Sequence, residues 1–380
     1  MKKILFFTPS CHRTGSEIVL YNLISNIDKS KFKAVGVVTY LKGELLSQFE
    51  PDIFTIDFEH SYPQILPLLE RLKIKAFKQD FYQQFLTKIH KKLKPDIWYI
   101  NTIIQSEVLY AAKLLDIPCI VHSHELEQML TNLSADYIEL LISYPKLIIA
   151  CSKTAEKVLK RLGRNDNIEV CYPSIDTSFL DQYTDPDCKV RFREKYNLPQ
   201  NAFIWLMSGT TDTNKNPIRF IELAKIIIEQ YPNIYFIWLG SDSKSAMNTY
   251  LTQYSNELGI SKKIRWVDSL KQKEYYQYFT TVDSLILTSS RESFSIVTLE
   301  AMYLGKPVIS LNCGGPNEII IKDTGQIIDS WDNGTIAKAM IEVMSRETDY
   351  NCITAKQQSS IFTTTNQAKR WNKILLKYFS

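Results

Sequence analysis

The chain has 380 residues, of which 45% are hydrophobic and 23% charged, and its formal net charge is +4. This composition is ordinary for a folded protein and excludes an intrinsically disordered chain. The modest charge gives no support to nucleic-acid binding, so no nucleic-acid partner is expected. Because a single hydrophobic core rarely grows beyond about 250–300 residues, two domains are expected.

The N-terminal segment is interpreted as a buried strand rather than a signal peptide, since its apolar run Ile4–Phe7 is too short for the hydrophobic region of a signal. No stretch approaches about 18 consecutive apolar residues, so no membrane-spanning helix is expected. The seven cysteines are scattered and include no CxxC pair, which argues against a zinc site and against a disulfide framework. Reduced thiols, and with them a cytoplasmic location, are the simpler interpretation.

Short apolar runs alternate with longer amphipathic runs along the chain, a pattern that predicts parallel sheets in an α/β fold. The strands predicted in the first half are Lys3–Thr8, Ala34–Thr39, Ile97–Ile100, Cys119–Val121 and Leu147–Ala150. Those predicted in the second half are Phe203–Ser208, Tyr235–Gly240, Ile264–Val267, Ser284–Thr288 and Val308–Leu311. Helical periodicity lies between them, for example over Ser16–Ile27, and again over Gln367–Phe379.

The periodicity is interrupted near residues 175–195 by prolines and aspartates, and this interruption predicts the boundary between two domains. The first domain is expected to span residues 1–180 together with the C-terminal helix, residues 364–380. The second is expected to span residues 181–363.

Polar residues follow several predicted strands of the first half. Gly15 precedes a helix start, but it is a lone glycine rather than a dinucleotide-binding fingerprint, and helix capping by Thr14 is an ordinary alternative. Asn101 follows the third predicted strand, and His122 and His124 end the fourth, where side chains face the ligand crevice of a parallel sheet. A buried, hydrogen-bonded histidine is the competing interpretation. A metal site would need a third ligand, which the sequence does not place nearby, so none is expected.

A basic stretch, residues 66–94, interleaves lysines with aromatic residues such as Phe81 and Phe85. One interpretation is an amphipathic helix in peripheral contact with an anionic membrane at its inner face. The alternative, slightly favoured here, is a solvated helix whose aromatic residues pack inward.

The second half carries the strongest signal. A helix is predicted to start near Ser295 and to stop before Gly305, so the backbone N–H groups of Ser295, Ile296 and Val297 form a natural anion site. Glu292 precedes this helix and Glu300 lies inside it; taken alone, they are readily explained as a dipole-stabilising residue and a solvated one.

This stretch resembles the E-x7-E signature of retaining glycosyltransferases of family four. Glu292 and Glu300 have the spacing of the two family glutamates, and the following residues read LEAM-x-x-GKPVI as in the family. The loop that contains Gly314 and Gly315 is similar to the family's GG-x-x-E-I-I loop, which faces the donor. Ser295 stands where the family usually has glycine.

The resemblance implies the GT-B fold: two Rossmann-like domains with parallel sheets facing across a cleft, and a C-terminal helix that crosses back. It assigns catalytic roles to His124, Glu292 and Lys215, with Glu300 accepting hydrogen bonds from a ribose. Donor-binding residues are then Gly15, Gly209, Lys215, Glu292, Ser293, Phe294, Ser295, Ile296, Val297, Glu300, Gly314 and Gly315. On the acceptor side lie Thr14, Asn101 and His122.

The loop after Gly209 resembles the family's G-R…K-G loop, whose Arg and Lys neutralise the leaving group. Only Lys215 carries over, because Thr210 stands at the arginine position and Asn216 at the glycine.

The function implied is that of a retaining, metal-independent hexosyltransferase without a cofactor. It would move a sugar from a UDP- or GDP-sugar to a glycan or lipid-linked acceptor in cell-surface polysaccharide or lipopolysaccharide assembly. The alternatives are a non-catalytic nucleotide-sugar-binding protein, which the missing arginine suggests, and a sugar-nucleotide epimerase of the same fold.

Overall fold

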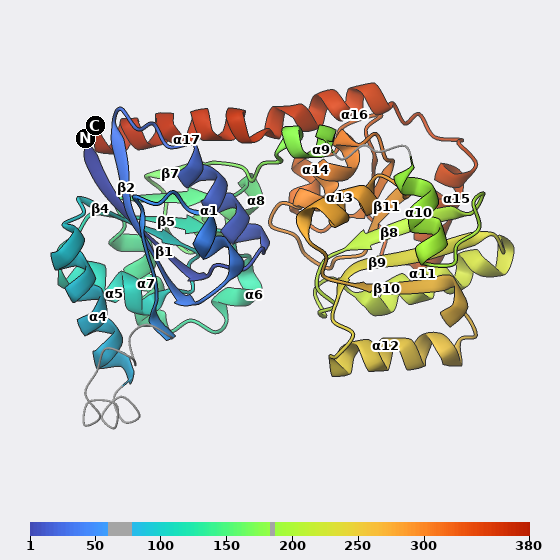
Figure 1. Ribbon diagram of the computed structural model, residues 1–380, viewed down its shortest axis with the longest axis horizontal. Coiled ribbons are helices and arrows are strands. Elements are labelled where there is room, and N and C mark those ends of the chain that lie inside the picture. The colour runs from blue at the N-terminus through green and yellow to red at the C-terminus, as the bar shows by residue number, and fades with distance from the viewer. Residues whose placement is uncertain (60–77, 183–186) are drawn as a thin grey trace. The chain divides into compact units, whose positions relative to one another are not determined.

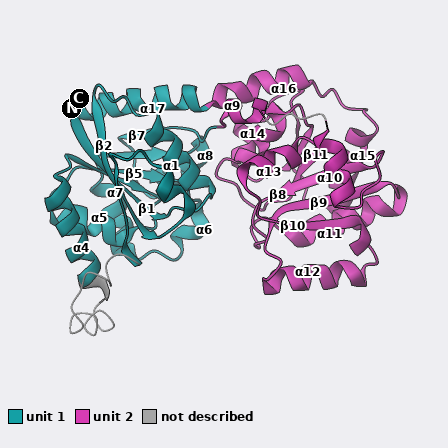
Figure 2. Ribbon diagram, in the orientation of Figure 1, with its two compact units in different colours: residues 1–174, 364–380 teal, residues 175–363 magenta. Residues whose placement is uncertain are grey.

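The computed structural model describes residues 1–59, 78–182 and 187–380, and the chain forms two compact units (Figures 1 and 2). Unit 1 consists of Met1–Ser174 and Thr364–Ser380, and unit 2 of Ile175–Thr363. The sequence placed the boundary slightly later, at residue 180. The division falls where it does because Ile175 donates its backbone N–H to Phe362 O (3.0 Å) within unit 2, whereas Ser174 and Thr364 interact within unit 1.

Unit 1 is built on a seven-stranded sheet in which every pairing is parallel, with strand order β3-β2-β1-β4-β5-β6-β7. Its strands are β1 (Lys2–Ser10), β2 (Phe32–Leu41), β3 (Phe54–Asp57), β4 (Ile97–Asn101), β5 (Cys119–Ser123), β6 (Leu147–Ala150) and β7 (Ile168–Val170). The helices described are α1 (Gly15–Ser25), α4 (Lys78–Leu93), α5 (Ser106–Leu114), α6 (Glu127–Leu130), α7 (Ala135–Ser143), α8 (Lys153–Arg161) and α17 (Thr364–Phe379).

Unit 2 is built on a six-stranded parallel sheet of order β10-β9-β8-β11-β12-β13. Its strands are β8 (Phe203–Ser208), β9 (Ile234–Ser241), β10 (Ile264–Asp268), β11 (Ser284–Leu287), β12 (Val308–Leu311) and β13 (Gln326–Ile328). The α-helices are α9 (Thr177–Gln182), α10 (Cys188–Lys195), α11 (Pro217–Gln230), α12 (Ala246–Glu257), α13 (Gln272–Phe279), α14 (Ile296–Tyr303), α15 (Asn333–Met344) and α16 (Cys352–Ser359).

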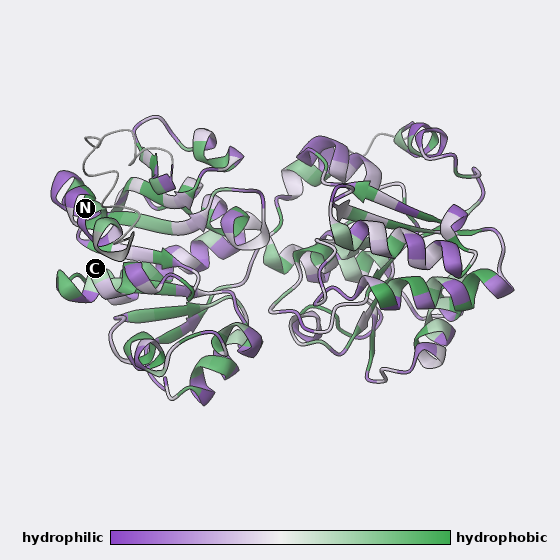
Figure 3. Cartoon of the chain, turned by 90° about the horizontal axis from the view of Figure 1, so that it is seen from below, coloured by the Kyte–Doolittle hydropathy of each residue, from purple (hydrophilic) through white to green (hydrophobic). Residues whose placement is uncertain are grey.

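The central strands are mostly apolar because both faces of each sheet are covered. All five residues of β4 and all four of β12 are buried. Figure 3 shows hydrophobic residues concentrated in the strands and hydrophilic residues in the loops and on the helices. The two-domain parallel α/β fold expected from the sequence is confirmed.

The C-terminal helix α17 belongs to unit 1, where it packs against α1. Trp371 is fully buried there. Asn372 fastens the helix further, because its Nδ2 donates to Asn26 O (2.9 Å) and its Oδ1 accepts from Asp28 N (2.8 Å).

The basic stretch 66–94 is described only from residue 78 onward, as α4; residues 66–77 lie outside the described part. The apolar face of α4 is buried in the core of unit 1 through Tyr82, Phe85, Leu86 and Ile89. Membrane contact through this face of α4 is therefore not supported, because the aromatic side chains that would insert are already packed. Within the described ranges, no helix is long and apolar enough to cross a membrane.

Both sheets have a topological switch point, where the strand order reverses direction. In unit 1 it lies between β1 and β4, and in unit 2 between β8 and β11. Loops that leave adjacent strands at such a point turn to opposite sides and open a crevice at the carboxyl edge of the sheet, which is where α/β proteins bind ligands.

Candidate active site

The residues singled out from the sequence gather at these two switch points. In unit 1, Gly15 lies after β1 and Asn101 ends β4. In unit 2, Lys215 lies in the loop after β8 and Glu292 in the loop after β11. Each unit therefore carries its own group of candidate residues, and each group is described by itself.

Lys215 and Glu292, far apart in sequence, form an ion pair in unit 2. Lys215 Nζ lies 2.5 Å from Glu292 Oε1, and both side chains are largely buried, with 21% and 10% of their surface exposed. Ser289 Oγ donates to the same oxygen at 2.6 Å. The pair holds a cation and an anion in fixed positions at the carboxyl edge of the sheet.

The two loops that carry this pair are joined by one backbone hydrogen bond and two hydrogen bonds from side chains to backbone. Asn214 O accepts from Ser290 N (2.7 Å), and Asn214 Nδ2 donates to Arg291 O (2.9 Å). Thr288 Oγ1 donates to Lys215 O (2.8 Å). These bonds make the loops one rigid support, so the ammonium of Lys215 is positioned rather than left on a mobile surface chain.

Helix α14 begins at the predicted place, directly after Ser295. Ser295 adopts a left-handed conformation (φ 95°), and its side chain does not cap the helix but interacts with Thr298 Oγ1 at 2.9 Å. Glycine tolerates this backbone region far better than serine, so the family's glycine at this position has a conformational explanation. The side chain of Ser295 thus leaves the N–H groups of the first turn, including those of Ile296 and Val297, to an anion.

The loop that contains Gly314 and Gly315 packs against the residues just before this helix. Gly315 N donates to Glu292 O (2.7 Å), and Glu292 and Gly314 form a parallel bridge. A Cβ atom added to Gly315 would lie 2.2 Å from Phe294 Cα, so no side chain fits there. Phe294 itself is buried, with its ring 5.4 Å from that of Phe362, so its side chain serves the core while its backbone shapes the site.

Glu300 is buried rather than solvated. Its Oε2 accepts from Tyr275 OH at 2.9 Å and its Oε1 from Tyr276 OH at 3.0 Å, both from α13. Tyr275 OH also lies 3.2 Å from Ser208 Oγ at the end of β8. Burial raises the pKa of Glu300 to about 7, against the lowering effect of the two tyrosine hydrogen bonds.

Thr210, at the position of the family's arginine, interacts through its hydroxyl with Asp212. Asp212 Oδ1 also accepts the backbone N–H groups of Asn214 (2.9 Å) and Lys215 (3.0 Å). In this loop, therefore, a hydroxyl bound to a carboxylate stands at the position where the family has a second cation. Gly209 has a φ of 146°. A Cβ atom built on it would lie 3.2 Å from Lys215 Cε, so the Lys215 side chain passes close to this glycine.

In unit 1, His124 is oriented by Asn101. Asn101 Nδ2 points toward Thr8 Oγ1 (3.4 Å) and Ser16 O (3.3 Å), so its Oδ1 faces His124 Nε2 at 2.9 Å. The acceptor Oδ1 requires a proton on Nε2, which leaves Nδ1 as the acceptor of the ring. Burial lowers the pKa of His124 to about 3, so the imidazole is neutral at physiological pH.

His122 is fully buried beside it, with the two rings 4.1 Å apart. Its Nδ1 lies 2.8 Å from Tyr99 OH, which accepts from Trp371 Nε1 at 3.3 Å. Among the described residues, His122 Nε2 has no hydrogen-bond partner. Burial keeps the pKa of His122 well below its usual value, so its imidazole is neutral like that of His124.

The first turn of α1 contains a buried carboxylate, Glu17, that the sequence argument did not select. Glu17 is 6% exposed and accepts from Ser16 Oγ (2.7 Å), from Ser10 Oγ (3.3 Å) and from the hydroxyl of Thr14. Thr14 is the N-cap residue of α1 by position, but its side chain binds Glu17 instead of the helix N–H groups. Next to Gly15 there is open space, since nothing lies within 4 Å of a built Cβ.

Glu125 holds the backbone next to His124 in place. Its Oε2 accepts the backbone N–H groups of His124 (2.8 Å) and Ile103 (3.2 Å). Burial raises the pKa of Glu125 to about 7 in spite of these bonds. In the described part of the chain, no group of three or more His, Cys, Asp or Glu side chains is placed to hold a metal ion.

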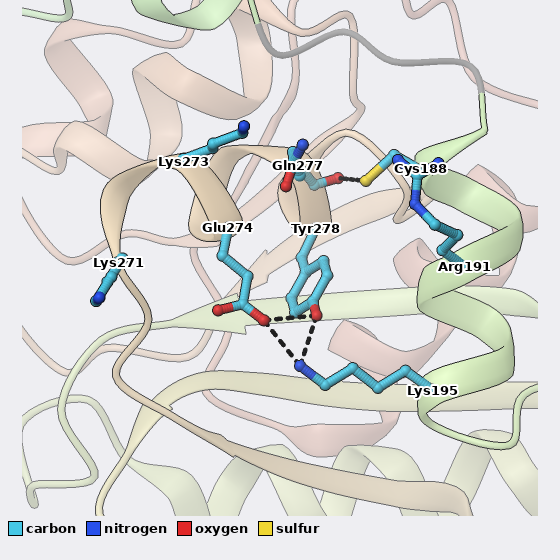
Figure 4. Close-up of a pocket in the computed structure, with 8 residues that line it drawn as sticks. All are labelled: Cys188, Arg191, Lys195, Lys271, Lys273, Glu274, Gln277 and Tyr278. Atoms are coloured by element: carbon cyan, nitrogen blue, oxygen red, sulfur yellow. Dashed lines mark hydrogen bonds and ion pairs between the residues drawn. The ribbon is translucent and has the colours of Figure 1, made fainter.

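A separate hollow of about 450 Å³ lies on unit 2 and contains none of the predicted site residues (Figure 4). It is lined by Cys188, Arg191, Lys195, Lys271, Lys273, Glu274, Gln277 and Tyr278. Lys195 Nζ is bound there to Glu274 (2.8 Å) and to Tyr278 OH (2.7 Å), and the side chains of Lys271 and Lys273 diverge from that pair (Figure 4). This arrangement does not present converging groups to one ligand.

Comparison with known proteins accounts for most of the chain. Residues 13–179 match the family model "Glycosyltransferase Family 4", and residues 189–359 match "Glycosyl transferases group 1". The D-inositol 3-phosphate glycosyltransferase of Streptomyces avermitilis is 24% identical over 211 residues, which are 53% of this chain and 45% of the relative. The chain thus spans about half the length of several curated relatives that it matches.

A longer match is the UDP-Gal:alpha-D-GlcNAc-diphosphoundecaprenol alpha-1,3-galactosyltransferase of Escherichia coli, which is 25% identical over 304 residues, or 76% of each chain. Among solved structures, Anabaena Alr3699/HepE in complex with UDP-glucose superposes with a TM-score of 0.79 at 19% identity, covering 99% of this chain and 100% of that one. The lipopolysaccharide outer core galactosyltransferase WaaB, in its apo form, gives a TM-score of 0.70 at 17% identity, covering 99% of both chains. These likenesses show the GT-B fold, and with the two family models they establish that the chain belongs to the family-four-like glycosyltransferases of group 1.

Proposed function

We propose that this chain is a retaining hexosyltransferase that moves a sugar from a nucleoside-diphosphate sugar, most simply a UDP-hexose, to an acceptor hydroxyl. The observation that carries the proposal is the switch point of unit 2. There Lys215, Glu292 and the start of α14, which no side chain caps, are held together by the hydrogen-bonded loops after β8 and β11.

The groups of unit 2 suit a diphosphate that becomes more negative as it leaves. Lys215 supplies a positive charge in a position that is already set by Glu292, and the N–H groups at the start of α14 supply fixed dipoles. Because these donors are preorganised, little reorganisation is needed when charge develops in the transition state. In this proposal the carboxylate of Glu292 binds both the ammonium of Lys215 and the hydroxyls of the donor sugar.

In unit 1, the neutral ring of His124 suits hydrogen bonding to an uncharged sugar hydroxyl. Its Nε2 is hydrogen-bonded to Asn101, which fixes both the orientation of the ring and the tautomer that carries the proton on Nε2. Thr14 and Gly15, at the neighbouring loop, leave open space in which an acceptor can approach.

The proposed transfer breaks the bond between the anomeric carbon and the diphosphate oxygen, and it forms a bond from that carbon to the acceptor oxygen. The proton of the acceptor hydroxyl passes to the departing diphosphate. No enzyme nucleophile is invoked, and retention of the anomeric configuration is proposed from the E-x7-E resemblance at Glu292 and Glu300.

Uridine is proposed as the base because a similar solved structure holds UDP-glucose and a similar curated protein is named for UDP-galactose. The latter name also supports a lipid-linked glycan as the acceptor class. Assembly of a cell-surface polysaccharide or lipopolysaccharide is proposed on the same basis.

The test is to incubate the purified chain with UDP- and GDP-hexoses and a panel of glycan and polyprenyl-diphosphate-sugar acceptors, and to measure released nucleotide. Proton NMR of the product gives the anomeric configuration. Acceptor-dependent release of UDP with a retained anomer is expected; an inverted anomer would remove the retaining assignment. Acceptor-independent conversion of the donor sugar into its epimer would instead identify an epimerase.

A non-catalytic nucleotide-sugar-binding protein is the second candidate, and the Thr210–Asp212 interaction favours it, because a threonine bound to a carboxylate stands where the family has an arginine. Such a protein would bind UDP-hexose tightly without turnover, and substitution of His124 would leave this binding unchanged. Measurable acceptor-dependent turnover that His124→Ala reduces would exclude it.

A further inference from the structure

Glu300 is held by two consecutive residues of α13. Tyr276 donates to one carboxylate oxygen and Tyr275 to the other, at 3.0 and 2.9 Å. Glu300 is only 6% exposed, so the orientation of its carboxylate is set by these phenols rather than by water. Both tyrosines were missed by sequence reasoning, because no motif marks them.

We propose that Tyr275 and Tyr276 are positioning residues that hold Glu300 for the two ribose hydroxyls of the donor nucleotide, and so make the site selective for ribonucleotides. This inference rests on the proposed function, in which Glu300 binds the ribose. It deepens that function by naming the groups that determine how the sugar of the nucleotide is recognised.

The count of hydrogen bonds supports this role. An ionised carboxylate has about four acceptor directions, two on each oxygen. The phenols of Tyr275 and Tyr276 use one direction on each oxygen of Glu300, which leaves one on each. Two remaining acceptors, one per oxygen, match the two hydroxyl donors of a ribose diol. A carboxylate turned away from this orientation would bind at most one of them.

Tyr275 has a second contact, with Ser208. Its OH lies 3.2 Å from Ser208 Oγ, at the end of β8 and next to Gly209. Since the single phenol proton is donated to Glu300, Ser208 donates to the phenol oxygen. These two hydrogen bonds connect Glu300 to the strand that precedes the Lys215 loop. They therefore fix the proposed ribose-binding group relative to the proposed phosphate-binding group.

The phenols also act on the charge of Glu300. Burial raises the pKa of this carboxyl to about 7, and the hydrogen bonds from Tyr275 and Tyr276 lower it. Because only the ionised form accepts from two hydroxyls while also accepting from both phenols, removing a phenol should raise the pH needed for nucleotide binding.

The experiment measures dissociation constants of UDP and 2′-deoxy-UDP by isothermal titration calorimetry, with GDP and 2′-deoxy-GDP in parallel. The proteins are wild type, Tyr275→Phe, Tyr276→Phe and the control Tyr278→Phe. Tyr278 is also on α13, but its OH binds Lys195 and Glu274 instead of Glu300 (Figure 4). Thermal melts establish that each variant is folded.

Wild type should bind the ribonucleotide about tenfold more tightly than the deoxyribonucleotide, as expected for one hydrogen bond to a charged group. Tyr275→Phe and Tyr276→Phe should bind the ribonucleotide more weakly and lose most of this preference, and their binding should require a higher pH. Tyr278→Phe should match wild type in both respects.

A ribose preference that survives in both Tyr275→Phe and Tyr276→Phe would overturn the inference and leave the proposed function standing. An equal loss of affinity in Tyr275→Phe and Tyr278→Phe with an unchanged preference would also overturn it, since that result identifies a structural role. If wild type binds none of the four nucleotides, both the donor site and this inference are wrong.

Discussion

The carboxyl edges of the two sheets share a topology but differ in charge. In unit 1, burial lowers the pKa of His124 to about 3, so the imidazole that contacts Asn101 is uncharged. In unit 2, Lys215 and Glu292 meet as an ion pair at 2.5 Å. An uncharged imidazole suits the proposed acceptor hydroxyl and an ion pair suits the proposed diphosphate, so one kind of βα scaffold can carry two binding chemistries by changing the side chains at its loops.

The largest effect should come from removing the cation of unit 2. Lys215→Met keeps the bulk of the side chain but removes the charge, so transition-state stabilisation of the leaving diphosphate is lost. We expect kcat/KM for UDP release to fall by about 10²–10³-fold, the loss typical for one preorganised donor.

The matched control is Lys225→Met, a surface lysine that pairs with Glu229 within one helix. It should retain wild-type kcat/KM. An active Lys215→Met variant would show that the helix start alone carries the diphosphate charge.

The pH dependence of stability tests the buried carboxylate of unit 2. The pKa of Glu300 rises from its ordinary 4.5 to about 7 on folding, so the folded state keeps a proton that the unfolded state releases. Stability should therefore fall as pH rises from about 4.5 to about 7, by at most about 3 kcal/mol, and stay level above that range.

Glu300→Gln mimics the protonated form and isolates this contribution. Urea unfolding followed by hydrogen exchange in α14 should give similar stabilities for wild type and variant near pH 4.5, with the variant more stable at pH 7.5. Parallel curves for the two proteins across this range would contradict the assignment.

The hydrogen-bonded chain of unit 1 should contribute less. Tyr99→Phe leaves Trp371 Nε1 and His122 Nδ1 buried without their shared partner. We expect a loss of about 2 kcal/mol in unfolding free energy, the usual cost of orphaned buried polar groups. Exchange rates of amides in β4 and α17 report this loss, and those of unit 2 serve as the internal reference. Uniform acceleration in both units would mean that the two unfold together.

The smallest effect is expected at His124. His124→Ala removes one neutral hydrogen-bonding group, so kcat/KM should fall about tenfold, equivalent to about 1.4 kcal/mol, while the dissociation constant of UDP is unchanged. His12→Ala is the control, because His12 is exposed and paired with Glu44. A weaker binding of UDP itself would move His124 from the acceptor side to the donor side.

The sequence predicted the long central strands well because they are continuous apolar runs. It missed β3, β7 and β13, which have only four, three and three residues and are largely half-buried or exposed. Such short edge strands are specified by their neighbours in the sheet rather than by their own pattern.

The spacing of Glu292 and Glu300 was enough to select both as candidate residues. Their surroundings could not be predicted, because Tyr275 reaches Glu300, and Ser208 reaches Tyr275, from distant segments. Glu17 is different: it lies two residues after Gly15, in the first turn of α1, and its burial could have been suspected from the three hydroxyl residues around it.

The close packing of Gly315 against Phe294 has a practical consequence for engineering. Any mutagenesis library intended to change the sugar preference should leave position 315 untouched, because every other amino acid would push its first carbon into a neighbouring backbone 2.2 Å away. Variation is better introduced at Ser293, the residue before Phe294, which is only half-buried.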